Sequence, residues 1–200
     1  MNLDDPEILD AMARDAVRRR KVKRDLAAIP PRVQPHLDNP DETEAVQAVR
    51  AFMASDRTLL VISGGVGTGK TIAGCVALEV AFQSDGKGPT GTFLKAIDLV
   101  RAGSFNTDFW SQVAKVPVLV VDDLGTEPLD DKGWIIANIH ALLDSRYDHC
   151  LKTIFTTNLP ADKFKARYGC DGGRLIDRLR EVGTFISLAG SSMRSAGGTQ

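Results

Sequence analysis

The chain has 200 residues, 43% of them hydrophobic, which is enough for one folded domain and a short additional arm. Its 25 Lys and Arg residues nearly balance 26 Asp and Glu residues, so net charge alone indicates no nucleic-acid partner, and any such binding requires a local patch. Three cysteines without a C-x-x-C pair argue against a zinc module or disulfide framework, and the lack of a signal core or of roughly 18 consecutive apolar residues favours a cytoplasmic, non-membrane protein.

The N-terminal region, 1–28, is predicted to be a helical arm. Its apolar residues recur near the 3.6-residue period of a helix over 3–27, and a basic run occupies 18–24. One interpretation is a solvated helix whose acidic start and basic end suit the helix dipole. The other is an arm that docks on a protein or nucleic acid. The apolar residues expected to contact such a partner are Ile8, Leu9 and Met12.

A proline-rich segment follows the arm. Its four prolines predict a linker over 29–40 that hinges the arm on the main domain. We expect that domain to cover 41–190, beginning with a short helix at 41–54. The last residues, 191–200, are small and polar and are expected to form a flexible tail.

A glycine-rich loop lies between a predicted strand at 59–62 and a predicted helix at 72–82. Its spacing, G-x-x-x-x-G-K-[ST], is that of a P-loop, in which glycines let successive backbone N–H groups surround phosphate oxygens. The lysine would reach the β- and γ-phosphates, and the threonine hydroxyl would bind Mg²⁺. A glycine turn without a ligand is the alternative. The predicted phosphate-binding residues are Gly64, Gly65, Val66, Gly67, Thr68, Gly69, Lys70 and Thr71.

Strand and helix patterns alternate along the rest of the chain. The predicted strands are 90–94, 116–121, 151–157 and 184–188. The predicted helices are 96–114, which is irregular, 135–147, 160–167 and 172–181. This alternation predicts an α/β fold with an open, mainly parallel sheet, whose site lies at the carboxyl ends of the strands.

Two aspartates follow the buried strand at 116–121. Asp122 is predicted to be the Walker B carboxylate that holds Mg²⁺ together with Thr71. Asp123 would face the attacking water and deprotonate it. Asn158, at the end of the next strand, would hydrogen-bond the same water or the γ-phosphate. The alternative for the Asp pair is an ordinary turn or helix N-cap.

Two arginines lie four residues apart in the predicted helix at 172–181. Arg174 or Arg178 is predicted to act as an arginine finger on the γ-phosphate. Because this helix is expected to point away from its own P-loop, we expect the finger to act on a neighbouring subunit. An ion pair between Arg178 and Asp177 is the alternative.

These residues resemble the AAA+ ATPases of the DnaC helicase-loader and IstB transposition-helper type. The resemblance covers about residues 28–194 and is specific in the ordered combination of its motifs. The segments that carry it are Ile29-Pro-Pro-Arg32, Gly64 to Thr71, Val120-Val-Asp-Asp-Leu-Gly125, Leu142-Leu-Asp-Ser-Arg-Tyr147, Thr153-Ile-Phe-Thr-Thr-Asn-Leu159, Arg174-Leu-Ile-Asp-Arg-Leu179 and Gly190-Ser-Ser-Met-Arg194.

The resemblance implies a three-layer αβα P-loop NTPase with a five-stranded parallel sheet of order 5-1-4-3-2, and we see no obvious C-terminal lid domain. It implies binding of ATP and Mg²⁺, Asn158 as sensor 1, and Arg178 as the finger in trans. It also implies a ring or filament of subunits that binds single-stranded DNA. The residues placed where such proteins face DNA are Lys95, Arg101, Phe105 and Trp110; for the two aromatic residues, a place in the core is the alternative.

The leading functional hypothesis from this resemblance is an ATPase that loads a replicative DNA helicase. An IstB-like helper that acts with a transposase on duplex DNA is the runner-up. A P-loop kinase and a nucleotide-gated binding module with negligible turnover are further alternatives. Asp123 is one methylene shorter than the glutamate common at this position, so hydrolysis is expected to be slow.

Overall fold

The computed structural model describes residues 6–84, 91–103, 107–128, 133–168 and 174–189. Its helices are α1 (Pro6–Leu26), α2 (Glu44–Ala54), α3 (Lys70–Ser84), α4 (Ala96–Gly103), α5 (Thr107–Lys115), α6 (Trp134–Asp148), α7 (Ala161–Tyr168) and α8 (Arg174–Val182), with a 3-10 turn η1 (Gln34–Leu37). Its strands are β1 (Leu59–Gly64), β2 (Gly91–Lys95), β3 (Val118–Asp122), β4 (Lys152–Thr157) and β5 (Gly183–Leu188). The predicted tail, 191–200, lies outside the described residues.

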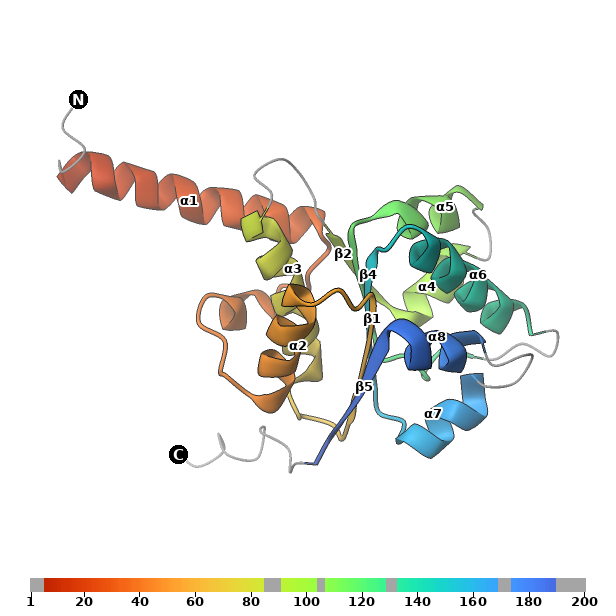
Figure 1. The fold of residues 1–200 in the computed structure, drawn as a ribbon. Coiled ribbons are helices and arrows are strands. Elements are labelled where there is room, and N and C mark those ends of the chain that lie inside the picture. The colour runs from red at the N-terminus through yellow and green to blue at the C-terminus, as the bar shows by residue number, and fades with distance from the viewer. Residues whose placement is uncertain (1–5, 85–90, 104–106, 129–132, 169–173, 190–200) are drawn as a thin grey trace.

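The five strands form one parallel sheet in the order β2-β3-β4-β1-β5, which confirms the expected order 5-1-4-3-2 and the αβα fold class. Apolar residues alternate along β1 between two cores. Leu60 and Ile62 pack with α2 and α3, whereas Leu59 and Val61 pack with helices on the other face. Figure 1 shows α2 and α3 on one side of the sheet and α4 to α8 on the other. The sheet is therefore buried on both faces, as parallel strands require.

The helix predicted over 96–114 is divided in the structure. Helix α4 ends at Gly103, a residue type that often terminates helices, and α5 begins at Thr107. Phe105, one of the predicted DNA-contacting residues, lies outside the described part of the chain.

The segment predicted to be a linker, 29–40, packs into the core instead. Ile29, Val33 and Leu37 are all buried and belong to the hydrophobic cluster that contains α3. The backbone N–H of Phe93 in β2 also donates to the carbonyl of Ala27, at 2.7 Å. The sequence pattern marked the prolines as a hinge, but the apolar residues between them make this segment part of the domain.

The end of α1 is joined to the domain by ion pairs of Arg24. Arg24 Nε donates to Oε1 of Glu79 in α3 at 2.5 Å, and Arg24 Nη2 donates to Oδ1 of Asp38 at 2.9 Å. The side chains of Arg24 and Glu79 are each less than a tenth exposed. From this joint α1 extends away from the domain (Figure 1), and Met12 is 58% exposed near its far end.

Candidate nucleotide-binding site

The glycine loop between β1 and α3 adopts a backbone that requires glycine. Gly67 and Gly69 have φ angles of 84° and 81°, in the left-handed region that side-chained residues rarely adopt. At Gly64, an added Cβ would lie 3.0 Å from both Leu188 Cβ and Thr68 Oγ1. Val66, at the loop, is 66% exposed. The conformation therefore explains the glycine spacing directly.

Lys70 is the first residue of α3, and its side chain folds back into the loop. The ammonium group donates to the carbonyl oxygens of Gly64 (2.8 Å) and Gly65 (2.6 Å) and to the hydroxyl of Thr68 (3.3 Å). Burial lowers the pKa of Lys70, while the carboxylates of Asp123 and Asp122 act in the opposite direction. A bound phosphate would compete with these carbonyl oxygens for the ammonium group.

Asp122 lies at the end of β3 and is fully buried. Its carboxylate accepts hydrogen bonds from the hydroxyl of Thr71, at 3.0 and 3.1 Å, and from the hydroxyl of Thr156, at 2.5 Å. Burial raises the pKa of Asp122, and the hydrogen bonds from Thr156 and Thr71 oppose this shift. The structure thus brings together Thr71 and Asp122, the two residues predicted to hold Mg²⁺.

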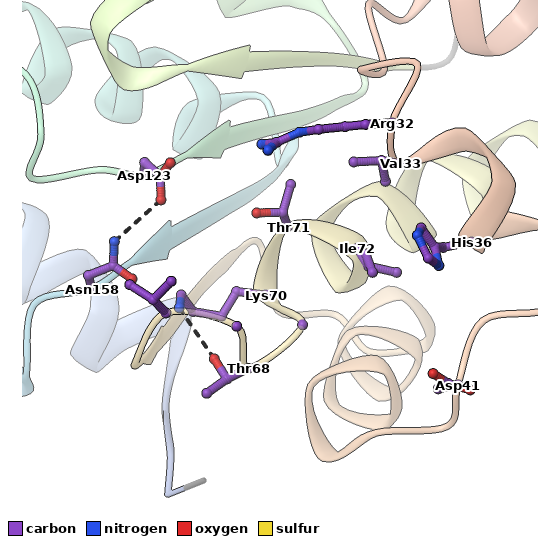
Figure 2. Close-up of a pocket in the computed structure, with 13 residues that line it drawn as sticks. Arg32, Val33, His36, Asp41, Thr68, Lys70, Thr71, Ile72, Asp123 and Asn158 are labelled. Atoms are coloured by element: carbon purple, nitrogen blue, oxygen red, sulfur yellow. Dashed lines mark hydrogen bonds between the residues drawn. The ribbon is translucent and has the colours of Figure 1, made fainter. Parts of the chain in front are cut away.

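Asp123 has a left-handed backbone, with φ of 59°, which is uncommon for a residue other than glycine. Its N–H donates to Thr156 Oγ1 at 3.0 Å, so one threonine hydroxyl contacts both aspartates. Asn158 Nδ2 lies 3.5 Å from Asp123 Oδ1 (Figure 2). Thr156 was not predicted to belong to the site, although it lies near the end of β4, two positions before Asn158.

A cavity of about 560 Å³ lies over the glycine loop. Figure 2 shows its lining, to which the loop and α3 contribute one side and Asp123 and Asn158 another. Four residues from the segment before α2 complete the lining, and none of them was predicted to belong to the site: Arg32, Val33, His36 and Asp41. Of these four, only Arg32 belongs to a motif noted in the sequence, Ile29-Pro-Pro-Arg32.

These residues fit a magnesium nucleotide. The positive-φ glycines form a cradle beside the Lys70 ammonium group, and Thr71 and Asp122 supply the oxygen ligands that Mg²⁺ prefers. Asp123 and Asn158 line the same cavity (Figure 2). The site therefore has a glycine loop with a lysine that fits phosphate, and polar groups that are able to hold a water molecule.

Arg178 does not line this cavity. Its guanidinium group lies near Oδ1 of Asp144 (3.5 Å) and Oε2 of Glu181 (3.1 Å) and over the ring of Tyr147 (3.9 Å). The alternative interpretation named Asp177 as its ion-pair partner, but Asp177 pairs with Arg180 at 3.5 Å. Arg174 begins α8, and its side chain lies outside the described part of the structure.

The predicted DNA-contacting residues have different environments. Trp110 is partly buried against the core, and its ring makes edge contacts with Phe109 and Trp134 at centroid distances of 6.0 and 6.2 Å. This packing agrees with the alternative of a core residue. Arg101 is exposed on α4, and Lys95 is partly buried at the end of β2.

Among the described residues, no helix is long and apolar enough to cross a membrane.

Together, the parallel sheet of order 5-1-4-3-2, the glycine loop and the paired aspartates define a P-loop αβα fold of the AAA+ class. The family model for the IstB-like ATP binding proteins matches residues 12–199, and the chain belongs to this family. The match covers nearly the whole chain, including most of α1. No curated protein matches the chain.

Solved structures share this fold. A DnaC helicase loader has a TM-score of 0.63 and 24% identity, over 80% of this chain and 100% of the loader. AMPPCP-bound DnaA from Aquifex aeolicus has a TM-score of 0.62 and 20% identity, over 83% of this chain and 53% of DnaA. A replication initiator DnaA bound to AMPPCP and single-stranded DNA has a TM-score of 0.57 and 20% identity, over 82% of this chain and 51% of DnaA.

Proposed function

We propose that this protein hydrolyses ATP with Mg²⁺ and uses the reaction to load a replicative DNA helicase onto single-stranded DNA. The observation that supports ATP binding most strongly is the hydrogen bond from Thr71 to Asp122, beside the ammonium group of Lys70. Membership of an ATP-binding family supports the same nucleotide. The helicase is proposed by analogy with the DnaC loader, whose fold this chain shares. Calorimetry with ATP and Mg²⁺ is the first test, and a lack of binding would refute the proposal.

The proposed chemistry assigns one task to each residue of the site. Lys70 and the backbone N–H groups of the loop bind the phosphates, and Thr71 and Asp122 hold Mg²⁺, which neutralises charge on the phosphates when bound. Asn158 orients a water molecule toward the γ-phosphorus, and Asp123 accepts its proton. The water oxygen forms a bond to the γ-phosphorus while the bond between the γ-phosphorus and the β,γ-bridging oxygen breaks, which gives inorganic phosphate and ADP.

Replacing Asp123 with Asn is expected to slow phosphate release by about a hundredfold, since the proton acceptor is lost. Affinity for ATP should change by less than about threefold, because Thr71 and Asp122 remain and a neutral side chain repels phosphate less. Asn tolerates the left-handed backbone of this position, so the fold should persist. Release is measured with single-stranded DNA and helicase present. The exposed Asp162→Asn serves as control, and an unchanged rate in Asp123→Asn would exclude the assigned role.

We further propose that assembly into an ATP-bound oligomer places Arg178 of one subunit against the γ-phosphate of its neighbour. Support comes from its position, since Arg178 lies on α8 and does not line the cavity of its own chain. Arg174 is the alternative finger. Loss of an arginine finger lowers hydrolysis by roughly 10³ to 10⁵-fold.

A mixing experiment tests the role in trans. Arg178→Ala alone is expected to bind ATP normally and release almost no phosphate, and Lys70→Ala alone should be inactive because its site is empty. Mixed subunits should recover part of the activity, since the Lys70→Ala chain still supplies Arg178 to its neighbour. A mixture as inactive as its components would assign Arg178 a purely structural role in its contacts with Asp144 and Tyr147.

A second candidate function is that of a transposition helper on duplex DNA, which is favoured by the IstB-like family match. The two functions are distinguished by mixing the protein with a replicative helicase and, in a parallel experiment, with duplex DNA. A helicase complex supports the loader. ATP-dependent filaments on duplex DNA without any helicase complex support the helper.

Two other functions make distinct predictions. A P-loop kinase would transfer phosphate to a nucleoside or nucleotide instead of releasing it. A nucleotide-gated binding module would release no phosphate even with DNA and partner present, and Lys70→Ala would abolish partner binding.

In the loader we expect Met12, with Ile8 and Leu9, to contact the helicase. The exposed side chain of Met12 supports this assignment.

A further inference from the structure

Arg32 is a cation at the nucleotide cavity that the proposed chemistry does not use. It lines the cavity together with Lys70, Thr71 and Asp123. In Figure 2 its extended side chain crosses from the segment before α2 toward the space between Asp123 and Thr71. The side chain is exposed, and it has no hydrogen-bond or ion-pair partner within the described residues. A guanidinium group directed at a polar cavity without a protein partner is available to an anionic ligand.

The backbone that carries Arg32 is held in place. Its neighbours Ile29 and Val33 are only 2% and 4% exposed, so both sides of the turn are anchored in the core. The N–H of Val33 donates to the carbonyl of Pro30 at 2.8 Å, which closes the turn. Two consecutive prolines, Pro30 and Pro31, also restrict the backbone. Binding a ligand therefore requires ordering of the arginine side chain alone.

The position of Arg32 indicates which part of a bound nucleotide its guanidinium group would contact. The γ-phosphate and Mg²⁺ belong beside Lys70 and Thr71, whereas Asp123 faces the attacking water. Arg32 points into the region that these three residues enclose (Figure 2). A guanidinium group is suited to phosphate because its fork of N–H donors matches two phosphate oxygens.

We propose that Arg32 donates hydrogen bonds to the terminal phosphate of bound ATP, within the same chain. This inference rests on the proposed ATP binding and adds a γ-phosphate contact to it. The contact distinguishes ATP from ADP. Because Ile29 N–H donates to the carbonyl of Arg24 at 3.0 Å, the segment that carries Arg32 continues directly from α1. The contact therefore links the terminal phosphate to the base of the arm.

Nucleotide affinity tests the proposal without reference to hydrolysis. Calorimetry with the non-hydrolysable analogue AMPPCP and with ADP, each with Mg²⁺, is carried out on the full chain. Arg32→Ala is expected to weaken AMPPCP binding by about tenfold or more, as for a lost charged hydrogen bond, and ADP binding by less than about threefold. Arg32→Lys should restore part of the difference, because it keeps the charge but loses the fork. The exposed Arg180→Ala is the matched control and should affect neither nucleotide.

The possible failures are distinguishable. If native protein binds both nucleotides and Arg32→Ala binds AMPPCP as tightly, the γ-phosphate contact is refuted and ATP binding stands. An equal loss for AMPPCP and ADP would also refute it, since the arginine would then contact a part common to both. Native protein that binds neither nucleotide would overturn the proposed function and this inference together. Thermal unfolding of each variant checks the fold, which we expect to be unaffected because Arg32 is exposed.

Discussion

Lys70→Ala is expected to lower the affinity for ATP by about a hundredfold or more. The ammonium group is the only side-chain cation that the P-loop itself contributes, and it lies among the loop carbonyls of Gly64 and Gly65. Removing charged hydrogen bonds to two phosphates costs roughly 3 kcal/mol, which corresponds to this loss of affinity. Calorimetry with ATP and Mg²⁺ measures the effect directly.

The control for this variant is Lys163→Ala, which removes an exposed lysine from α7, away from the cavity lining. It should bind ATP as the native protein does. The fold of Lys70→Ala is expected to persist, because the loop conformation depends on its glycines as well as on the lysine. Native affinity in Lys70→Ala would mean that phosphates do not bind at this loop, and the assignments of Thr71 and Asp122 would then fail with it.

Arg146→Met is expected to lower the free energy of unfolding by about 3 to 5 kcal/mol. Arg146 is 1% exposed on α6, and its guanidinium group donates to Thr153 Oγ1 and to the backbone carbonyls of Val113, Val116 and Lys152, at 2.6 to 3.0 Å. Burial lowers its pKa to about 10, so the group still carries its charge at neutral pH. Methionine fills similar space but removes the hydrogen bonds that these carbonyls accept from the guanidinium group, and such a loss is costly for buried polar groups.

Urea unfolding followed by circular dichroism measures this loss. Domains of this kind have total stabilities of about 5 to 15 kcal/mol, so the variant should unfold at a much lower urea concentration. The exposed Arg180→Met provides the matched control, with a change expected below about 0.5 kcal/mol. A loss under about 1 kcal/mol in Arg146→Met would show that water or rearranged backbone replaces the arginine. This residue was noticed in the sequence only as part of a family motif.

Some parts of the site were accessible from sequence because they depend on local geometry. The glycine loop is one continuous segment, and the φ angles of Gly67 and Gly69 explain its spacing. Asp122 and Asp123 follow a fully apolar strand, and parallel strands end at one edge of the sheet, so their approach to the loop followed from topology. Asn158 was placed by the same reasoning, and it lies 3.5 Å from Asp123.

Other parts could not be predicted because they depend on packing between distant segments. Thr156 contacts both aspartates only because β4 pairs with β3. No sequence pattern indicates such a role for a threonine in a strand. Arg32 and His36 reach the cavity because the segment that carries them packs on α3. Prolines in that segment suggested a hinge, since the contribution of Val33 to the core is visible only after folding.

The sequence alone determined the α/β class and the glycine loop of this protein, because strand burial and glycine conformations are properties of short segments. The tertiary structure decided which residues complete the cavity, how α1 is joined to the domain through Arg24 and Glu79, and which side chains surround Arg178. These features depend on contacts between residues far apart in the chain. Such contacts are set by how whole elements pack, and no local pattern encodes them.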